Sequence, residues 1–189
     1  MRDQRNHLCC PPHDRSVCEG DREQPVADWV LPVVLVLDRL RSAFNVGNVY
    51  RLAEATRTAR IVTCGYTATP PHPKLVKTAR GCEVRVATDH AACAREAVEA
   101  LRASGHAVYA VETVAGATPV WNATFVFPCA FVLGNEALGV SAEALAACDE
   151  VIQLPSFGIK NSINVGNCAA VMLYAALQQW LEKDLGNNA

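Results

Sequence analysis

The sequence predicts an α/β fold built on a parallel sheet with helices on both faces. Short apolar runs, rich in valine, alternate along the chain with segments of helical pattern. Each run is continuous rather than alternating in polarity, which is typical of a strand buried on both faces. Strict alternation of strand and helix favours parallel βαβ units. With 189 residues, of which 51% are hydrophobic, the chain is expected to form one domain with a large core.

The predicted elements follow one another without an internal repeat. Residues 1–27 are polar, contain two adjacent prolines and show no period, so we predict a flexible tail before a domain at 28–189. Strands are expected at 29–37, 60–64, 83–87, 107–111, 129–133 and 150–154. Helices are expected at 46–57, about 73–80, 89–103, 141–147 and 164–183. Asp89 and Ser141 are expected to be N-caps, and Gly105 lies where a glycine would end the third helix.

Composition limits the classes of protein to which the chain can belong. No apolar run approaches the roughly 20 residues that span a bilayer, and the N-terminus lacks the apolar segment of a secretory signal. We therefore expect a cytoplasmic protein without a membrane anchor. The charged fraction is 19%, which is low for a fully solvated surface and predicts that a partner covers part of it.

The distribution of basic residues predicts local contacts with phosphate rather than a uniformly positive surface. The net charge is only −2, but basic residues gather in two short windows. The first contains Arg39, Arg41, Arg51, Arg57 and Arg60, and the second contains Lys74, Lys77 and Arg80. Both windows lie near the polar loops described below, which favours phosphate contacts over a solvated helix face.

Nine cysteines occur, and no pair has C-x-x-C spacing. Most are expected to act as small apolar residues in a reducing compartment. Cys9, Cys10 and Cys18, together with His7 and His13, fit no standard zinc spacing, so no metal site is expected.

Unusual polar groups are concentrated in three loops that follow predicted strands, where parallel sheets bind their ligands. The first loop, "DRLRSAFNVGNVYR", places Asn45 to cap the following helix, Gly47 to allow close backbone approach, and Arg51 about one and a half turns later.

The second loop, "FVLGNEALGVS", has the glycine spacing of a phosphate-binding P-loop. Val140 stands at the lysine position, however, and Glu136 would repel phosphate, so this turn is better suited to a flat, neutral or cationic ligand. No G-x-G-x-x-G follows any strand, which argues against a dinucleotide-binding oxidoreductase.

The third loop lies within "LPSFGIKNSINVGNCAAVML", residues 154–173. None of the five histidines is near Ser162, so a Ser/His nucleophilic site is not expected. Ser162 and Asn164 are suited to orienting a polar ligand. Small residues after them, from Gly166 to Ala170, would let the last helix pack closely on a neighbour.

Taken together, residues 30–182 resemble the SpoU (TrmH) family of S-adenosylmethionine-dependent RNA ribose methyltransferases, in the knotted SPOUT class. The first family motif matches Asn45, Gly47 and Arg51, and the second matches Gly134, Glu136 and Gly139. The third matches Leu154-Pro155 and the run 162–165, and "KTARGCE" at 77–83 is similar to a segment of one branch of the family. All three motifs occur in order and at the family's separations.

The resemblance implies a SPOUT fold, in which the C-terminal segment forms a deep trefoil knot, and a homodimer. It implies S-adenosyl-L-methionine as cofactor, bound by Gly134, Leu154 and Ile163 at the knot, with the loop around Glu112 closing over it. It also implies an RNA partner, tRNA or rRNA. Because the sequence suggests no added RNA-binding domain, a small structured target such as a tRNA loop is slightly favoured over a large ribosomal site.

The resemblance further implies a catalytic group formed by Arg51, Asn45, Ser162, Asn164 and Glu136. Arginine is a poor base, because its pKa lies above about 12. We therefore expect Arg51 to orient the ribose 2′-OH and a neighbouring phosphate and to stabilise developing oxyanion charge. The residues expected to contact RNA are Arg39, Arg41, Lys77 and Arg80.

Two positions depart from the family pattern. Gly166 replaces the usual last serine of the third motif, and Arg57 stands where many relatives carry glycine. The lost hydroxyl near the site leaves open a second hypothesis, that of a catalytically silent member that binds RNA or cofactor without turnover.

Overall fold

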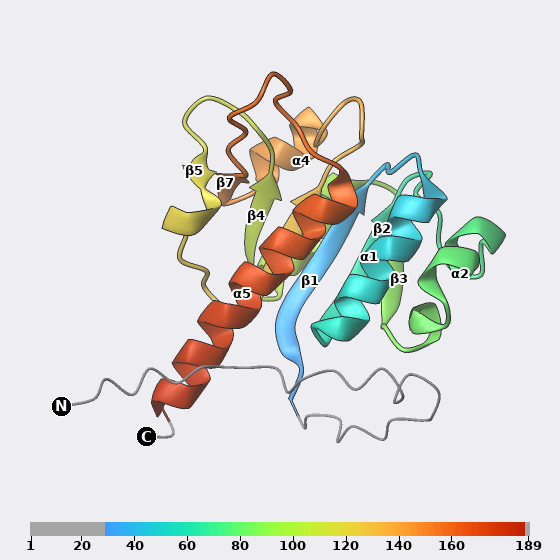
Figure 1. Ribbon diagram of the computed structural model, residues 1–189, viewed down its shortest axis with the longest axis horizontal. Helices are drawn as coiled ribbons and strands as arrows, with labels where there is room; N and C mark the ends of the chain where they lie inside the picture. The colour runs from blue at the N-terminus through green and yellow to red at the C-terminus, as the bar shows by residue number, and fades with distance from the viewer. Residues whose placement is uncertain (1–28, 188–189) are drawn as a thin grey trace.

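Figure 1 shows the computed structural model of the protein, which describes residues 29–187. The predicted tail, 1–27, and its cysteines and histidines lie outside this range. The strands are β1 (Leu31–Asp38), β2 (Thr58–Cys64), β3 (Thr88–Ala91), β4 (Ala107–Val111), β5 (Thr118–Pro119), β6 (Cys129–Leu133) and β7 (Glu150–Gln153). The helices are α1 (Ala43–Ala55), α2 (Pro73–Ala79), α3 (Ala94–Ala103), α4 (Ala142–Ala147) and α5 (Val165–Asn187), with short 3-10 turns η2 (Cys82–Val84) and η3 (Val120–Asn122).

Within the described residues the strands form one parallel sheet, as the sequence predicts. Its order is β3-β2-β1-β6-β4-β7-β5, and every neighbouring pair runs parallel. Strand β1 lies between β2 and β6, with Leu35 in register with Ile61 on one side and Phe131 on the other. The valine-rich runs of the sequence therefore form the interior strands.

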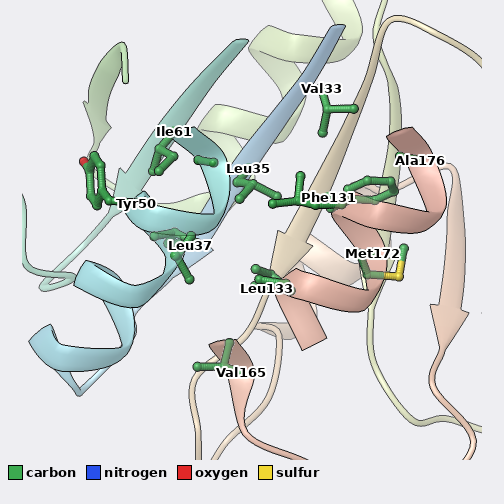
Figure 2. Packing of buried hydrophobic residues seen from close by; sticks show 14 of the residues in the cluster. Val33, Leu35, Leu37, Tyr50, Ile61, Phe131, Leu133, Val165, Met172 and Ala176 are labelled. Atoms are coloured by element: carbon green, nitrogen blue, oxygen red, sulfur yellow. The ribbon is translucent and has the colours of Figure 1, made fainter. Parts of the chain in front are cut away.

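Helices cover both faces of the sheet, which confirms the layered architecture. Side chains of β1 alternate between the faces, because successive residues of a strand point in opposite directions. Val33, Leu35 and Leu37 lie in the cluster that includes α1 and α5, as Figure 2 shows. Val34 and Val36 lie in a second cluster with residues of α3 and α4. None of the helices in the described part combines the length and apolar character needed to cross a membrane.

The region between β2 and α3 differs from the prediction. The expected strand at 83–87 is wrong, because a 3-10 turn occupies Cys82–Val84 and the strand β3 begins only at Thr88. Asp89 therefore lies in β3, not at an N-cap, and its carboxylate pairs with Arg60 at 2.8 Å. An edge strand with exposed polar residues lacks the apolar pattern that identified the interior strands. The two-residue strand β5 was too short to be predicted.

The start of α1 also differs from the prediction. Ser42 is the N-cap, and its hydroxyl accepts a hydrogen bond from the Asn45 backbone N–H at 3.3 Å. The expectation that Asn45 caps this helix is therefore wrong, because Ser42 already fills that position. As a result, the Asn45 side chain is available for other contacts. Ser141 precedes α4 as predicted, but its side chain makes no capping bond, while Gly105 follows α3 with φ +86°.

Arg57, at the position where many relatives carry glycine, has a left-handed backbone with φ +54°. A residue other than glycine pays for this conformation with about 1 kcal/mol or more of strain. Its side chain compensates, because Nε donates to the Trp29 carbonyl and the guanidinium lies 5.9 Å from the centre of the Trp29 ring. The departure from the family pattern is thus accommodated by contacts of the arginine itself.

The described cysteines are free thiols, two of which are fully buried, Cys64 and Cys129. Burial raises the pKa of each of these thiols to about 12. They therefore remain protonated at neutral pH and pack as small apolar side chains.

Gly47 is buried where α1 crosses α2. A β-carbon at this position would lie 2.6 Å from the Leu75 carbonyl oxygen and 2.7 Å from the Thr78 β-carbon. The glycine therefore sets the distance between the two helices, in agreement with the predicted close approach.

We predict that Gly47→Ala lowers the free energy of unfolding by roughly 1–3 kcal/mol, the usual effect of overpacking. Alanine favours helix over glycine by about 1 kcal/mol, so a loss of stability would show that the contact with α2 dominates. Urea unfolding measures the effect. Gly158→Ala is the control, since nothing lies within 4 Å of a β-carbon there, and equal stability of the two variants would contradict the prediction.

Candidate functional site

Four loops meet at the carboxyl edge of the sheet, because they follow strands that are neighbours in it. Strands β1, β6, β4 and β7 are adjacent and parallel, so the segments after them emerge at the same edge. In Figure 1 the first turns of α1 and α5 lie at this edge, although they are more than a hundred residues apart in the chain. The three motif loops of the sequence are thereby brought together.

The Glu136 carboxylate, in the loop after β6, joins that loop to the start of α1. One oxygen accepts the backbone N–H of Arg41 at 2.8 Å. The other accepts the backbone N–H of Ser42 at 3.1 Å and the side-chain amide of Asn45 at 2.9 Å. The carboxylate thus satisfies backbone donors just before the helix, where a negative charge is also favoured by the helix dipole.

The side chain of Asn45 continues this network to the third motif. Its Oδ1 accepts the Nδ2 of Asn164 at 3.2 Å, and the Oδ1 of Asn164 accepts the backbone N–H of Gly166 at 2.8 Å. Each amide donates through nitrogen and accepts through oxygen, so the orientations are mutually consistent. Glu136, Asn45 and Asn164 form a continuous hydrogen-bonded chain, hereafter the Glu-Asn-Asn chain, across all three motifs.

The hydrogen bonds to Glu136 keep its carboxylate ionised. Burial by itself raises the pKa of this group, but the bonds from Arg41, Asn45 and Ser42 outweigh that effect and leave the pKa below its ordinary value. A carboxylate that accepts several N–H groups is stabilised in its charged form.

A cavity of about 580 Å³ lies beside the Glu-Asn-Asn chain. It is lined by residues 111–113, 133–139, 154, 161–165 and 168. This volume is within the range of small-molecule sites. The predicted cofactor residues Glu112, Gly134, Leu154 and Ile163 all line it, together with three predicted catalytic residues, Glu136, Ser162 and Asn164.

One wall of the cavity is the turn from Gly134 to Gly139, held by Glu112. A β-carbon at Gly134 would lie 2.2 Å from both the Gly139 carbonyl carbon and the Val140 nitrogen, so only glycine permits this turn. The Glu112 carboxylate accepts the backbone N–H groups of Val140 at 3.0 Å and Thr113 at 2.9 Å. Glu112 therefore connects the loop after β4 to the turn after β6.

Arg51 lies outside the cavity. It is exposed on α1, six residues after Asn45, which places it about 120° away around the helix axis. It lines no part of the cavity of its own chain. Among the five predicted catalytic residues, Arg51 is thus the one that the fold of a single chain does not bring to the cavity or to the Glu-Asn-Asn chain.

The four predicted RNA-binding cations also lie outside the cavity wall. Arg39 pairs with the buried carboxylate of Asp38 at 2.9 Å, while Arg41 is exposed and offers its backbone N–H to Glu136. Lys77 is exposed on α2, and Arg80, also exposed, follows the end of that helix.

Two polar residues that hold the loops in place were missed by the sequence analysis. Asn135 is buried and donates to the Arg39 carbonyl at 2.7 Å and the Tyr66 hydroxyl at 2.8 Å, while its oxygen accepts two backbone N–H groups of its own turn. Asp38 is buried and accepts the Ser141 N–H at 2.7 Å. For Asn135, the signal in the sequence was its position between two motif residues. For Asp38, the signal was a carboxylate at the end of an apolar strand.

The charges around the cavity favour a ligand with net positive charge. Glu112 and Glu136 are the charged residues among those that line it, within the part of the chain that the structure describes. The remaining polar groups are amides, hydroxyls and backbone atoms. This combination fits a small cationic molecule such as S-adenosylmethionine and does not fit a polyphosphate, which two carboxylates would repel.

Comparison with known proteins supports the same assignment. Residues 32–174 match the model of the SpoU rRNA Methylase family. The chain is 30% identical over 159 residues to the 23S rRNA (uridine(2479)-2'-O)-methyltransferase of Streptomyces viridochromogenes, which covers 82% of this chain and 55% of that protein. It is 38% identical over 90 residues to the tRNA (guanosine(18)-2'-O)-methyltransferase of Thermus thermophilus, covering 48% of this chain and 46% of that one. The chain thus spans about half the length of these curated relatives.

Solved structures of the family share the fold. The SpoU methyltransferase AviRb from Streptomyces viridochromogenes, in complex with the cofactor AdoMet, superposes with a TM-score of 0.72 at 28% identity. The match covers 83% of this chain and 60% of that chain. Since the three motifs lie together in this fold and the family model covers most of the sequence, the chain belongs to the SpoU rRNA Methylase family.

Proposed function

We propose that the chain transfers a methyl group from S-adenosyl-L-methionine to a ribose 2′-OH of RNA. The observation that carries this proposal is the Glu-Asn-Asn chain, which joins residues of three distant motifs at the wall of one cavity. The relatives are named as 2′-O-methyltransferases of rRNA and tRNA. The RNA substrate of this chain is accordingly a tRNA or an rRNA.

The residues that would hold the cofactor are Glu112, Gly134, Leu154 and Ile163. When bound there, S-adenosylmethionine supplies an electrophilic methyl group. The backbone of the turn after Gly134 and that of Leu154 and Ile163 suit polar atoms of an uncharged part of the ligand. Glu112 complements its positive charge.

The Glu-Asn-Asn chain and Ser162 orient the ribose. The side chain of Asn164 is fixed by two hydrogen bonds, and Ser162 lies two residues before it on the same cavity wall. Groups held in place before the substrate arrives reduce the entropy cost of alignment, which is a large part of the barrier for a group transfer.

Arg51 stabilises the negative charge that develops on the ribose oxygen as its proton leaves, and it positions an adjacent phosphate. A guanidinium stays charged at all working pH values, so it acts through hydrogen bonds and charge rather than as a base. Arg41, Lys77 and Arg80, which are exposed, contact further phosphates of the RNA backbone, and so does Arg39, which is half-buried beside Asp38.

The functional unit is a homodimer in which Arg51 of one subunit serves the cavity of the other. The arginine does not line the cavity of its own chain, and helices α1 and α5 carry exposed apolar side chains. Phe44 on α1 and Val171 and Tyr174 on α5 are 50%, 41% and 53% exposed, although these two helices pack against each other. Large apolar side chains on two adjacent helices are suited to a second copy of the chain.

The finer topology is the deep trefoil knot of the SPOUT class, in a single domain at 28–189. The connection from β7 to α5 supports the proposed knot. This strand lies toward one end of the sheet, yet α5 returns to pack on α1, β1 and β6. A long return of this kind passes the edge where the other motif loops emerge.

The working compartment is the cytoplasm. The described cysteines are all free, and the buried thiols have raised pKa values, which suits a reducing environment.

Arg51→Ala should retain cofactor binding and lose methyl transfer by about 100-fold or more, the usual effect of removing one oxyanion donor. Labelled S-adenosylmethionine with total RNA measures the transfer, and calorimetry measures cofactor affinity. Arg95→Ala, an exposed arginine on α3, is the control with full activity. Cofactor or RNA binding by the wild type without any transfer would support the silent alternative and contradict the proposal.

Mixing two inactive variants tests whether the site is shared between subunits. Arg51→Ala and Asn164→Ala, exchanged in equal amounts, should recover about a quarter of wild-type transfer. Random pairing makes half of the dimers mixed, and each mixed dimer has one intact site if the arginine acts on its partner. No recovery, with mixed dimers shown by mass spectrometry, would mean that each chain uses its own Arg51.

Glu136→Gln should remove a pH-dependent contribution to stability. The pKa of Glu136 is lowered by folding, so its stabilisation is present above the unfolded value of about 4.3 and is lost as pH falls through the folded pKa. Wild type should therefore be more stable than the variant at pH 7, and the difference should vanish in acid. Urea unfolding of both proteins between pH 7 and pH 3 gives the result, and a constant difference would contradict the assignment.

A further inference from the structure

Gly166 lies where α5 begins, buried against α1. It is the second residue of the helix, and its backbone N–H is the one bonded by Asn164 Oδ1. A β-carbon at this position would lie 2.6 Å from Asn48 Nδ2 and 3.1 Å from Asn164 Oδ1. The space that a side chain at 166 would occupy is therefore already filled by the amide of Asn48.

Asn48 reaches this point because of its place on α1. It follows Asn45 by three residues, so the two side chains project from neighbouring positions on one face of the helix. Helices α1 and α5 pack against each other, and Asn45 bonds Asn164 on this same side. Asn45 and Asn48 consequently meet the first residues of α5 together.

We infer that Asn48 is a positioning residue of the methyl-transfer site, where it replaces the serine that the family pattern places at 166. This inference rests on the function proposed above. The Asn48 amide limits the room available to the Asn164 side chain, whose Oδ1 lies at the edge of the same space. It thereby keeps Asn164 in the rotamer that bonds both Asn45 and Gly166.

The inference explains the unusual glycine of the third motif. A serine at 166, as in the family pattern, would bring a hydroxyl to this space from α5 itself. Here the polar group comes from α1, 118 positions earlier in the chain (166 minus 48). The Asn48 amide thus fills the space that a serine side chain at 166 would fill, and it also supplies a polar group there. The missing serine hydroxyl therefore does not imply an inactive enzyme.

The test is a cycle of Asn48→Ala, Gly166→Ser and the double variant. Asn48→Ala frees the Asn164 rotamer, and Gly166→Ser puts a β-carbon against the Asn48 amide, so each single change should lower kcat roughly tenfold. The double variant, which rebuilds the family arrangement, should return to within about threefold of wild type. KM for the RNA and cofactor affinity should change less than about twofold throughout, because Asn48 does not line the cavity.

Thermal unfolding of all four proteins separates folding from positioning. Asn167→Ala, an exposed asparagine one residue further along α5, is the control with unchanged kcat. If Gly166→Ser fails to fold but the double variant folds, the result supports the inference that Asn48 fills the space of a side chain at 166. If neither variant folds, the inference is overturned. Folded variants whose effects on kcat simply add, or a Gly166→Ser variant as active as wild type, also overturn the inference.

The outcomes for the two proposals remain distinct. If the wild type transfers no methyl group, the proposed function fails and the positioning role fails with it. If the wild type is active but the double variant is no better than the weaker single variant, the positioning role alone is wrong.

Discussion

The Glu136 carboxylate is the interaction on which the arrangement of the site depends. A parallel sheet brings the ends of β1, β6 and β7 to one edge, but it does not fix the loops that follow them. Glu136 does so by accepting three N–H groups from the segment 41–45, and Asn45 extends the connection to the start of α5. These hydrogen bonds are all made within the protein itself.

This network also reconciles two requirements that compete in many sites. A cavity for a cation needs negative charge, while a surface for RNA needs positive charge. In this chain the carboxylates of Glu112 and Glu136 face the cavity, and the predicted RNA-binding cations stand outside its wall. Because Glu136 is bonded to backbone N–H groups rather than to these arginines, the cations are not neutralised by it.

The sequence was sufficient for the features that depend on strong local patterns. The interior strands were found because valine-rich runs are unmistakable, and the three motifs were found because their spacing is fixed. The edge strand β3 was not, since Asp89 and His90 give it no apolar pattern and its position depends on pairing with β2. Asn45 was assigned a capping role because it is a good N-cap residue, and only the observed start of α1 shows that Ser42 precedes it in that role.

The features of the site also divide into those that a local sequence pattern predicts and those that depend on distant contacts. Motif spacing predicted which residues line the cavity, but not that Arg51 lies outside it, because that depends on which face of α1 packs against its neighbours. Asn135 and Asn48 escaped notice for a related reason. Their contacts are with segments far away in sequence, and no local pattern records them.

Helix α1 is held on several sides at once. Val46, Val49 and Tyr50 pack on the sheet, Gly47 meets α2 and Asn48 meets α5, which leaves a narrow strip containing Phe44 and Arg51 in contact with solvent. These contacts fix the backbone of α1, so binding at Arg51 would order little additional backbone. In the proposed role of Arg51, binding of its guanidinium would therefore cost mainly the entropy of its own side-chain torsions, about 2 kcal/mol at most.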